Sequence, residues 1–247
     1  WEGAEEFVQG RKYDVVIYQK AYFVDHAKEF KGIKILDICD PDWLHWGYRT
    51  VELLQHCNAV TTSTQELADA ISKFTDKPVI CIPDRIDLDW YSKKKVHVGD
   101  AKNAVWYGYS TGFPLLNSAI PSLKKLGLGL IVIAERGFVL PAHFEGDIEV
   151  RNLPWSYENV NNDIITGDIV LNPRSTKNKW KFKSNNKTLG AWALGMPVAT
   201  SAEELQLFMK EESRKLEAEK RLKEIEEVWD VRKSAEEYKK LVAQLLS

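Results

Sequence analysis

The feature of this sequence that most constrains its fold is a regular alternation of short apolar runs with longer amphipathic stretches. The apolar runs are rich in valine and isoleucine, which favour strands, and the stretches between them are long enough for helices. We predict strands at residues 15–18, 33–38, 59–62, 79–82, 104–107, 130–134, 148–150, 169–171 and 197–200. Strands that alternate with helices in this way form parallel sheets, so the chain is predicted to be an α/β protein.

The series of strands is interrupted once, between residues 83 and 101, where turn-forming and charged residues replace the apolar pattern. A length of 247 residues is compatible with two small domains. We therefore predict two Rossmann-like, doubly wound domains, at residues 1–92 and 102–202, with a linker at residues 93–101. The first domain has four predicted strands and the second has five.

The last part of the chain, residues 203–247, is predicted to form long helices, because neither glycine nor proline occurs after Pro197. Charged residues dominate between positions 210 and 227, so this helix should be mostly solvated, and self-association through residues 203–227 is one use for its sparse apolar stripe. Ser201 and Ser234 each begin a capping-box sequence, as Ser63 does earlier in the chain, where it is predicted to start a helix. We expect the helix that follows Ser234 to pack back on the first domain.

The composition excludes several functional classes. With a net charge of −2, the chain has no global basic field of the kind that holds nucleic acid or an anionic membrane. Cys39, Cys57 and Cys81 lack the spacing of a zinc knuckle or a disulfide framework, which favours a reducing, cytoplasmic location. No apolar run reaches the ~18 residues that a membrane-spanning helix needs.

The most informative stretch is residues 172–199, which runs from a predicted strand end through a lysine-rich loop into a helix and a Gly-x-Pro turn. The sequence Lys183-Ser184-Asn185-Asn186-Lys187 lies where that helix should begin. A helix N-terminus with a hydroxyl, two amides and two ammonium groups suits a diphosphate. On these residues alone, a serine N-cap followed by solvated lysines explains the pattern equally well.

Three further motifs occur in a fixed order: Asn-Ala-Val-Thr-Thr-Ser at 58–63, Cys-Ile-Pro-Asp-Arg-Ile-Asp at 81–87, and Ala-Leu-Gly-Met-Pro-Val-Ala at 193–199. Together with the lysine-rich loop, this order resembles the GT-B glycosyltransferases of the broad group around families 4 and 1. The resemblance covers roughly residues 13–200. It implies a nucleotide-sugar donor, transfer of the sugar to an acceptor, and no metal or other cofactor.

The sequence departs from that group at one place. Many retaining members carry two glutamates eight positions apart, and the corresponding positions here are Phe182 and Gly190. The loop instead resembles a Lys-x-x-Lys variant, in which lysine holds the pyrophosphate. Donor binding is still expected, whereas retaining chemistry of the family 4 type is not.

The resemblance assigns donor-binding roles to residues at strand ends and at the helix start. Lys187 is the first choice for the phosphates. The other candidates are Lys183, Ser184, Asn185, Arg174, Gly108, Thr111, Gly112, Glu135 and Trp155. Each has a simpler alternative: a solvated lysine, an ordinary tight turn at Gly108, or a tryptophan that covers the core.

Catalytic candidates follow the predicted strand at 33–38. An inverting transfer needs a base that accepts the proton of the acceptor hydroxyl, and Asp40 or Asp42 could be that base, with help from His45. Either aspartate could instead cap the next helix. Since no nearby histidine or glutamate completes a ligand set, we predict no metal site.

Three functions remain open at this stage. The first is a metal-independent glycosyltransferase, whose acceptor is a glycan or, given the alternating lysines and aromatics at 177–183, a nucleic-acid base. The second is a catalytically inactive binding or assembly module, and the third is a sugar-nucleotide epimerase. The first domain is short for the group, and the chain opens on Trp1, so we expect an N-terminal piece to be missing or the domain to be reduced.

Overall fold

The computed structural model describes residues 12–45, 49–174 and 181–247. Within them the chain forms two compact units, which are described separately below. Unit 1 contains residues up to Asp84 together with 181–184 and 232–247, and unit 2 contains residues 85–174 and 185–231. The chain is an α/β protein with parallel sheets, as predicted.

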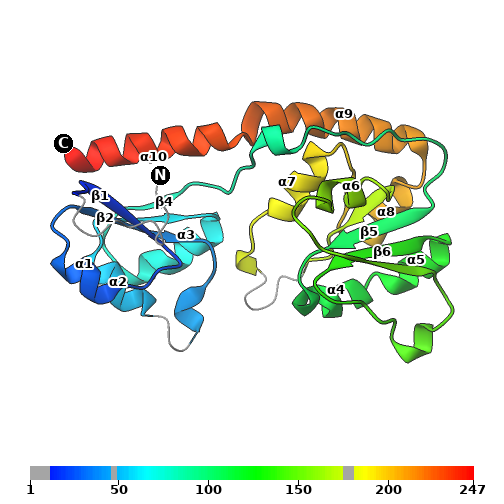
Figure 1. Cartoon of the computed structure of the whole chain (residues 1–247), viewed down its shortest axis with the longest axis horizontal. Coiled ribbons are helices and arrows are strands. Elements are labelled where there is room, and N and C mark those ends of the chain that lie inside the picture. Colours follow the sequence, from blue (N-terminus) through cyan, green and yellow to red (C-terminus); the bar gives the residue numbers. More distant parts are fainter. Residues whose placement is uncertain (1–11, 46–48, 175–180) are drawn as a thin grey trace. The chain divides into compact units, whose positions relative to one another are not determined.

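The sheet of unit 1 has four parallel strands in the order β1-β2-β3-β4 (Figure 1). They are β1 (Val15–Gln19), β2 (Ile33–Ile38), β3 (Ala59–Thr62) and β4 (Val79–Cys81). All four lie where the sequence predicted them. Neighbouring strands follow one another along the chain, so every crossover runs in the same direction across the sheet.

Right-handed crossovers in one direction place their helices on one face of a sheet. These helices are α1 (Val24–Glu29), α2 (Thr50–His56) and α3 (Gln65–Ile71). They share a core with Leu36 and Ile38 of β2. The opposite face of the sheet, with Ile35 and Ala59, is covered by Leu241 of α10 (Val231–Leu246). The last helix therefore packs on unit 1, as expected from the sequence.

Unit 2 has five parallel strands in the order β7-β6-β5-β8-β9. They are β5 (Asn103–Tyr107), β6 (Gly129–Ala134), β7 (Val150–Pro154), β8 (Ile169–Leu171) and β9 (Val198–Ala199). The strand order reverses between β5 and β8, so this sheet is doubly wound with a topological switch point at its centre. We expected the third of these strands at residues 148–150, and that expectation was wrong because the strand starts at Val150 and continues to Pro154.

Both faces of the unit 2 sheet are covered by helices (Figure 1). These helices are α4 (Phe113–Asn117), α5 (Ile120–Leu126), α6 (Val160–Ile164), α7 (Asn186–Ala193), α8 (Ala202–Leu207) and α9 (Glu211–Val228). Alternate residues of β5 enter different cores: Trp106 packs with Leu116 and Ile120, and Val105 packs with Leu189. The long charged helix predicted from the sequence is α9. Leu216 on it is 69% exposed, and self-association through 203–227 stays a prediction.

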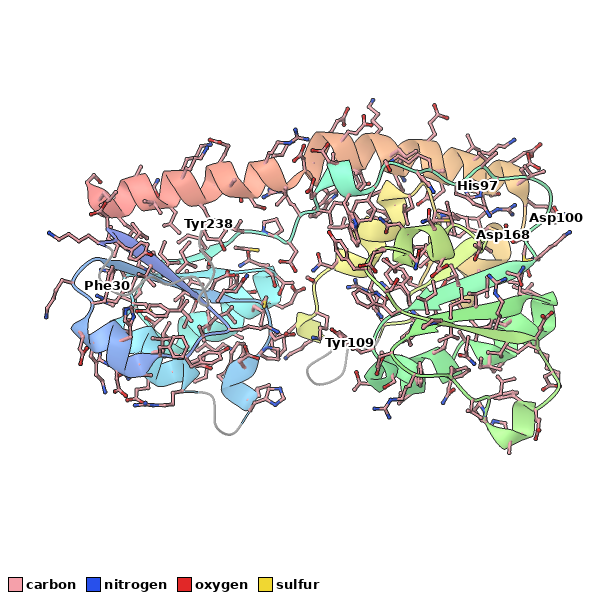
Figure 2. The ribbon with its side chains drawn as sticks, in the orientation of Figure 1. Phe30, His97, Asp100, Tyr109, Asp168 and Tyr238 are labelled. Atoms are coloured by element: carbon pink, nitrogen blue, oxygen red, sulfur yellow. The ribbon has the colours of Figure 1, made fainter. Side chains whose placement is uncertain are left out.

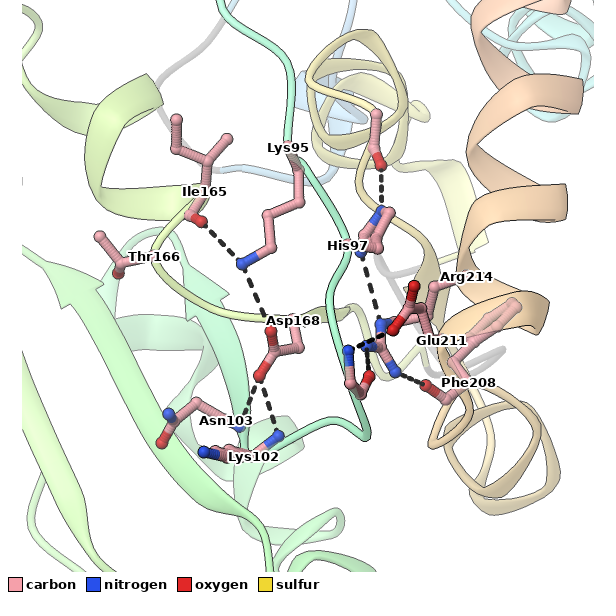
Figure 3. Close-up of polar contacts among 12 residues, drawn as sticks. Lys95, His97, Lys102, Asn103, Ile165, Thr166, Asp168, Phe208, Glu211 and Arg214 are labelled. Atoms are coloured by element: carbon pink, nitrogen blue, oxygen red, sulfur yellow. Dashed lines mark hydrogen bonds and ion pairs between the residues drawn. The ribbon is translucent and has the colours of Figure 1, made fainter.

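Residues 93–101, for which we expected a linker, are held along unit 2 (Figure 3). His97 is buried, and its Nε2 lies 2.9 Å from the carbonyl oxygen of Gly195. Arg214 of α9 is fully buried and donates to the carbonyls of Phe208 and Gly99. The segment is ordered because it supplies acceptors to a buried guanidinium, which must be hydrogen-bonded inside a protein.

Two predicted helix starts differ from the structure. Thr64, not Ser63, accepts the hydrogen bond from the backbone N–H of Leu67 and caps α3. Ser234 does not cap the last helix, which already begins at Val231; its hydroxyl donates to the carbonyl of Pro83 instead. Ser201 caps α8 as predicted, accepting from the N–H of Glu204 at 3.2 Å.

Among the helices of the described residues, none combines the length and the apolar composition required to cross a membrane.

Candidate functional site

The carboxyl ends of β5 and β8 meet at the switch point of unit 2, where ligands of open α/β sheets bind. Gly108 directly follows β5 and has a φ of 146°, a conformation that favours glycine. A Cβ atom added to Gly108 would lie 2.8 Å from Cε of Lys187 and would also collide with its ammonium group. The absence of a side chain at position 108 therefore leaves space for the Lys187 ammonium at this edge.

Lys187 is held in the first turn of α7 by its surroundings. The Tyr107 hydroxyl donates to the carbonyl oxygen of Lys187, and Nδ2 of Asn172 donates to Oγ1 of Thr188 at 3.0 Å. These bonds attach the start of α7 to β5 and to the residue after β8. The half-buried ammonium lies 4.5 Å from the centre of the Trp106 ring, at cation–π distance.

The N-terminus of α7 adds backbone donors to this cation. Its N-cap is Asn185, whose side chain makes no capping bond, so the serine N-cap considered from the sequence was wrong. The N–H groups of a first helical turn have no acceptor within the helix and carry the positive end of its dipole. An ammonium, backbone N–H groups and a glycine that permits close approach together can hold a diphosphate.

Other donor candidates lie around the same edge but have packing roles as well. A Cβ at Gly112 would lie 2.8 Å from Cζ2 of Trp106, so this glycine is needed for packing. Both carboxylate oxygens of Glu135 accept from the N–H of Ser110 at 3.0 Å. Hydrogen bonding from the Ser110 side chain, and then from this N–H, lowers the pKa of Glu135. Thr111, between them in the turn Ser110–Gly112, is exposed.

Two exposed aromatic side chains follow strands of unit 2. Trp155, directly after β7, is 50% exposed, so it does not belong to the core, which was its alternative role. Tyr109, directly after Gly108, is 78% exposed and was missed by the sequence analysis (Figure 2). Its place after a glycine at a strand end was the available signal. Arg174, close to the end of β8, is also exposed.

The carboxyl edge of the unit 1 sheet carries a different arrangement. Asp40, just after β2, pairs with two ammonium groups, those of Lys20 and Lys183, each at 2.5 Å. Lys20 follows β1 directly, and its φ of 50° lies in the left-handed region. Lys183 and Ser184, expected to bind the donor, thus lie in unit 1, whereas Asn185 and Lys187 lie in unit 2.

These pairs determine the charge of Asp40. Burial alone would raise the pKa of Asp40, but the hydrogen bonds from Lys183 and Lys20 outweigh burial and hold this pKa below its usual value. The bond to Asp40 raises the pKa of Lys20. Burial raises the pKa of the neighbouring Cys39 thiol to about 11. At neutral pH the edge therefore holds an ionised carboxylate, two ammonium groups and an un-ionised thiol.

Asp42 is the first residue of the short 3₁₀ turn Asp42–Leu44, and His45 follows the turn directly. Asp42 is buried and accepts a hydrogen bond from the hydroxyl of Tyr22, whose pKa is raised mainly by burial and also by this bond. The N-cap of the turn is Pro41, and no side chain caps it, so the capping role considered for Asp40 and Asp42 is wrong for this turn. His45 is exposed.

In the part of the chain that the structure describes, no three histidine, cysteine or acidic side chains gather as they would around a metal ion.

No protein-family model and no curated protein sequence matches this chain. Among solved structures it is similar to Alr3699/HepE of Anabaena, crystallised in complex with UDP, with a TM-score of 0.68 and 13% identity over 94% of this chain and 79% of that one. It is also similar to the glycosylation-associated Gap123 complex of Streptococcus agalactiae, with a TM-score of 0.49 and 11% identity over 85% of this chain. A third similar structure is a UDP-glucosyltransferase from Polygonum tinctorium, with a TM-score of 0.47 and 12% identity over 99% of this chain and 78% of that one.

This chain spans 51% of the Gap123 chain. The likeness to HepE shows the GT-B fold that the order of motifs predicted, and at this level of identity it shows the fold alone.

Proposed function

We propose that this protein is a nucleotide-sugar-dependent glycosyltransferase whose donor diphosphate binds at the switch point of unit 2. The observation that carries the proposal is the meeting of three anion-binding features: the space at Gly108, the ammonium of Lys187 and the N-terminus of α7. The fold likeness to HepE, a protein crystallised with UDP, supports a nucleoside diphosphate as the ligand.

In this proposal the same groups serve binding and chemistry. Cleavage of the bond between sugar and phosphate leaves negative charge on the departing diphosphate. Donors that already point at that charge lower the barrier without reorganising. Lys187 and the first N–H groups of α7 supply this stabilisation, with Arg174 as a second cation, so that the reaction needs no metal. Trp155 and Tyr109 offer exposed rings on which a nucleotide base can stack.

The acceptor side of the proposal rests on the carboxyl edge of unit 1. A general base there must accept a proton from the acceptor hydroxyl. Asp40 is a weak base while two ammonium groups hold its charge. Asp42, which accepts a hydrogen bond from the neutral hydroxyl of Tyr22, is therefore the better candidate, and His45 follows it closely in the chain. The acceptor itself, a glycan or a nucleic-acid base, stays open.

The test is thermal protection by a panel of nucleoside diphosphates, measured for the wild type, Lys187→Ala and Lys102→Ala. Lys102 is an exposed lysine of the same unit, directly before the amino end of β5, and serves as the matched control. Charge-assisted hydrogen bonds contribute ~1.5–3 kcal/mol, so Lys187→Ala should weaken binding by about 10- to 100-fold. Lys102→Ala should bind like the wild type. A panel without any protecting diphosphate would refute the proposal.

Catalysis needs its own measurement. Incubation of the wild type with the nucleotide sugar that matches the best diphosphate should release that diphosphate when a suitable acceptor is present. An altered sugar nucleotide formed without acceptor would instead identify an epimerase. Binding without turnover across a broad set of acceptors would point to the inactive binding module.

A further inference from the structure

Two consecutive residues at the end of β5 contact Lys187 at its two ends. Tyr107 is the last residue of the strand, and its hydroxyl donates to the backbone carbonyl oxygen of Lys187. Gly108 follows directly, and the ammonium of Lys187 lies where a Cβ of residue 108 would be. One strand end thus contacts both the backbone and the charged group of the same lysine. All three residues belong to unit 2.

The bond from Tyr107 adds a second donor to an oxygen inside a helix. In an α-helix each carbonyl oxygen accepts from the N–H four residues later, and its other lone pair can accept a second bond. Burial, and after it the neighbouring Tyr91, raises the pKa of Tyr107, so this hydroxyl keeps its proton at neutral pH and donates. Since the helix does not need this bond to form, its effect is to fix the first turn of α7 on the end of β5.

Gly190 provides the room for this approach. It is buried in α7, and a Cβ added there would lie 3.3 Å from the hydroxyl oxygen of Tyr107 and 3.0 Å from that of Tyr91. Both distances are shorter than most contacts of real Cβ atoms, so a larger side chain would push the hydroxyls away from the helix. Position 190 is one of the two at which retaining members of the resembled group carry glutamate. Here two tyrosine hydroxyls take up that space.

The next residue of α7 is attached to the other central strand. Asn172, directly after β8, donates from Nδ2 to Oγ1 of Thr188, and this bond is buried. Lys187 and Thr188 are therefore attached to the ends of β5 and β8, which are neighbours at the switch point. A helix start that is attached in this way has lost much of its freedom before any ligand arrives. Less entropy is then lost when its ammonium and N–H groups bind an anion.

We propose that Tyr107 is a positioning residue of the donor site, whose hydroxyl fixes Lys187 on the end of β5 so that the ammonium is in place beside Gly108 before the diphosphate binds. This inference rests on the proposed function, since it concerns the same ligand. Tyr107 acts through Lys187 and the first turn of α7.

The experiment measures UDP affinity by calorimetry in the wild type, Tyr107→Phe and Tyr91→Phe. Loss of the positioning hydrogen bond should weaken UDP binding about three- to tenfold in Tyr107→Phe. Tyr91→Phe is the matched control and should bind like the wild type, because the hydroxyl of Tyr91 also lies beside Gly190 but does not come from β5. Equal weakening by the two variants, or unchanged binding by Tyr107→Phe, would overturn the inference.

A double-mutant cycle with Lys187→Ala separates positioning from a general structural role. If Tyr107 acts through Lys187, then Tyr107→Phe should weaken UDP binding less than about twofold once the ammonium is absent, because the two residues are coupled. Losses that multiply in the double variant would show that Tyr107 stabilises unit 2 without positioning the cation, and they would overturn the inference.

Gly190→Ala covers the case in which Tyr107→Phe does not fold. The substitution is made in the Tyr91→Phe background, so that the new Cβ crowds only the hydroxyl of Tyr107. We expect weaker UDP binding than in Tyr91→Phe alone, and unchanged binding would overturn the inference. Absence of UDP binding by the wild type would instead refute UDP as the donor class and remove the basis of both proposals; UDP binding that ignores Tyr107 would remove only this one.

Discussion

In both units, the residue directly after the first described strand of the sheet has a positive φ. The side chains around this residue differ between the two units. In unit 2 this residue is Gly108, and the missing side chain leaves space for the ammonium of Lys187. In unit 1 it is Lys20, and its own ammonium pairs with Asp40. The ammonium of Lys187 lies against a glycine and a tryptophan ring, and the ammonium groups of Lys20 and Lys183 lie against the carboxylate of Asp40.

The topology of the sheets gives a reason for this difference. In unit 2 the strand order reverses beside β5, so the chain leaves the central strands toward opposite faces and their carboxyl ends stay open to a ligand. In unit 1 the described strands follow one another without a reversal, and β1 lies at the end of the order. The two sheets therefore both have a residue of positive φ after β1 or β5, but its surroundings differ: at Lys20 the side chain pairs with a carboxylate, and at Gly108 the missing side chain leaves space for an ammonium.

The largest expected effect follows from filling the space at Gly108. Gly108→Ala should weaken nucleoside diphosphate binding about 100-fold, because the new Cβ displaces the Lys187 ammonium. Gly127→Ala is the control, since Gly127 also has a positive φ, of 65°, but would meet no atom within 4 Å. Calorimetric titration of both variants separates crowding from backbone strain. Similar losses in the two would show that the space at Gly108 does not matter.

The next effect concerns unit 1 alone. Oδ1 of Asp37 accepts from the hydroxyl of Tyr238, at 2.9 Å, and from that of Thr61, at 2.7 Å, which joins α10 to the sheet (Figure 2). Removing one partner of such a bond costs ~1–3 kcal/mol. Tyr238→Phe should therefore speed hydrogen exchange in β2 and β3 and leave exchange in β5 and β6 unchanged. Leu245→Ala, elsewhere on α10, is a control for apolar contact.

The third prediction concerns pH and unit 2 (Figure 3). Burial lowers the pKa of His97, and Arg214 lowers it further, although the bond to Gly195 opposes them. A guanidinium can only donate, so His97 is neutral when its Nδ1 faces Nε of Arg214 at 3.4 Å. The unfolded chain takes up this proton near pH 6.5 and the folded chain only at lower pH.

Stability from His97 is consequently complete above about pH 6.5 and is lost as the pH falls below that value. Hydrogen exchange of the backbone N–H groups in α9 and β5, measured at several pH values, should show this loss as weaker protection below about pH 6.5. His97→Asn should flatten the pH dependence. Identical profiles for the two proteins would contradict the assignment.

The smallest effect tests the charges at the unit 1 edge. Both partners of the Lys183–Asp40 pair are partly exposed, so a double-mutant cycle with Lys183→Met and Asp40→Asn should give a coupling of only ~0.2–1 kcal/mol. Urea unfolding of the four proteins measures it. The Lys20–Asp40 pair offers a matched cycle at the same carboxylate. A coupling energy above this range would contradict the prediction and would show that the Lys183–Asp40 pair stabilises unit 1 more than a partly exposed ion pair does.

The sequence predicted the strands well because runs of β-branched residues are a local signal. It also placed Lys187 at the start of a helix and Gly108 after a strand, since both follow from local patterns. It did not predict that residues 181–184 belong to unit 1. Phe182 and Thr64 are 118 positions apart, and no local pattern records which distant core an aromatic residue enters.

The errors at helix ends have a similar cause. Ser63 begins a capping-box sequence with Glu66 three residues later, and Thr64 does not, yet β3 ends at Thr62 and Thr64 is the residue that caps α3. Ser234 begins a sequence typical of a cap, but α10 starts three residues earlier, beside an isolated bridge between Ile86 and Asp230. The two lysines that pair with Asp40 lie 20 and 143 positions away in the chain. The residues next to Asp40 in the sequence therefore could not reveal that its pKa is lowered.

The position of α10 has a consequence for synthesis on the ribosome. The strands of unit 1 leave the ribosome before unit 2, whereas the helix that covers one face of their sheet is made about 150 residues later. At typical elongation rates this delay is roughly 7 to 30 s. During that time Ile33, Ile35 and Ile80 have no α10 to cover them. Unit 2 can complete its fold first, although its first strand is made after all four strands of unit 1.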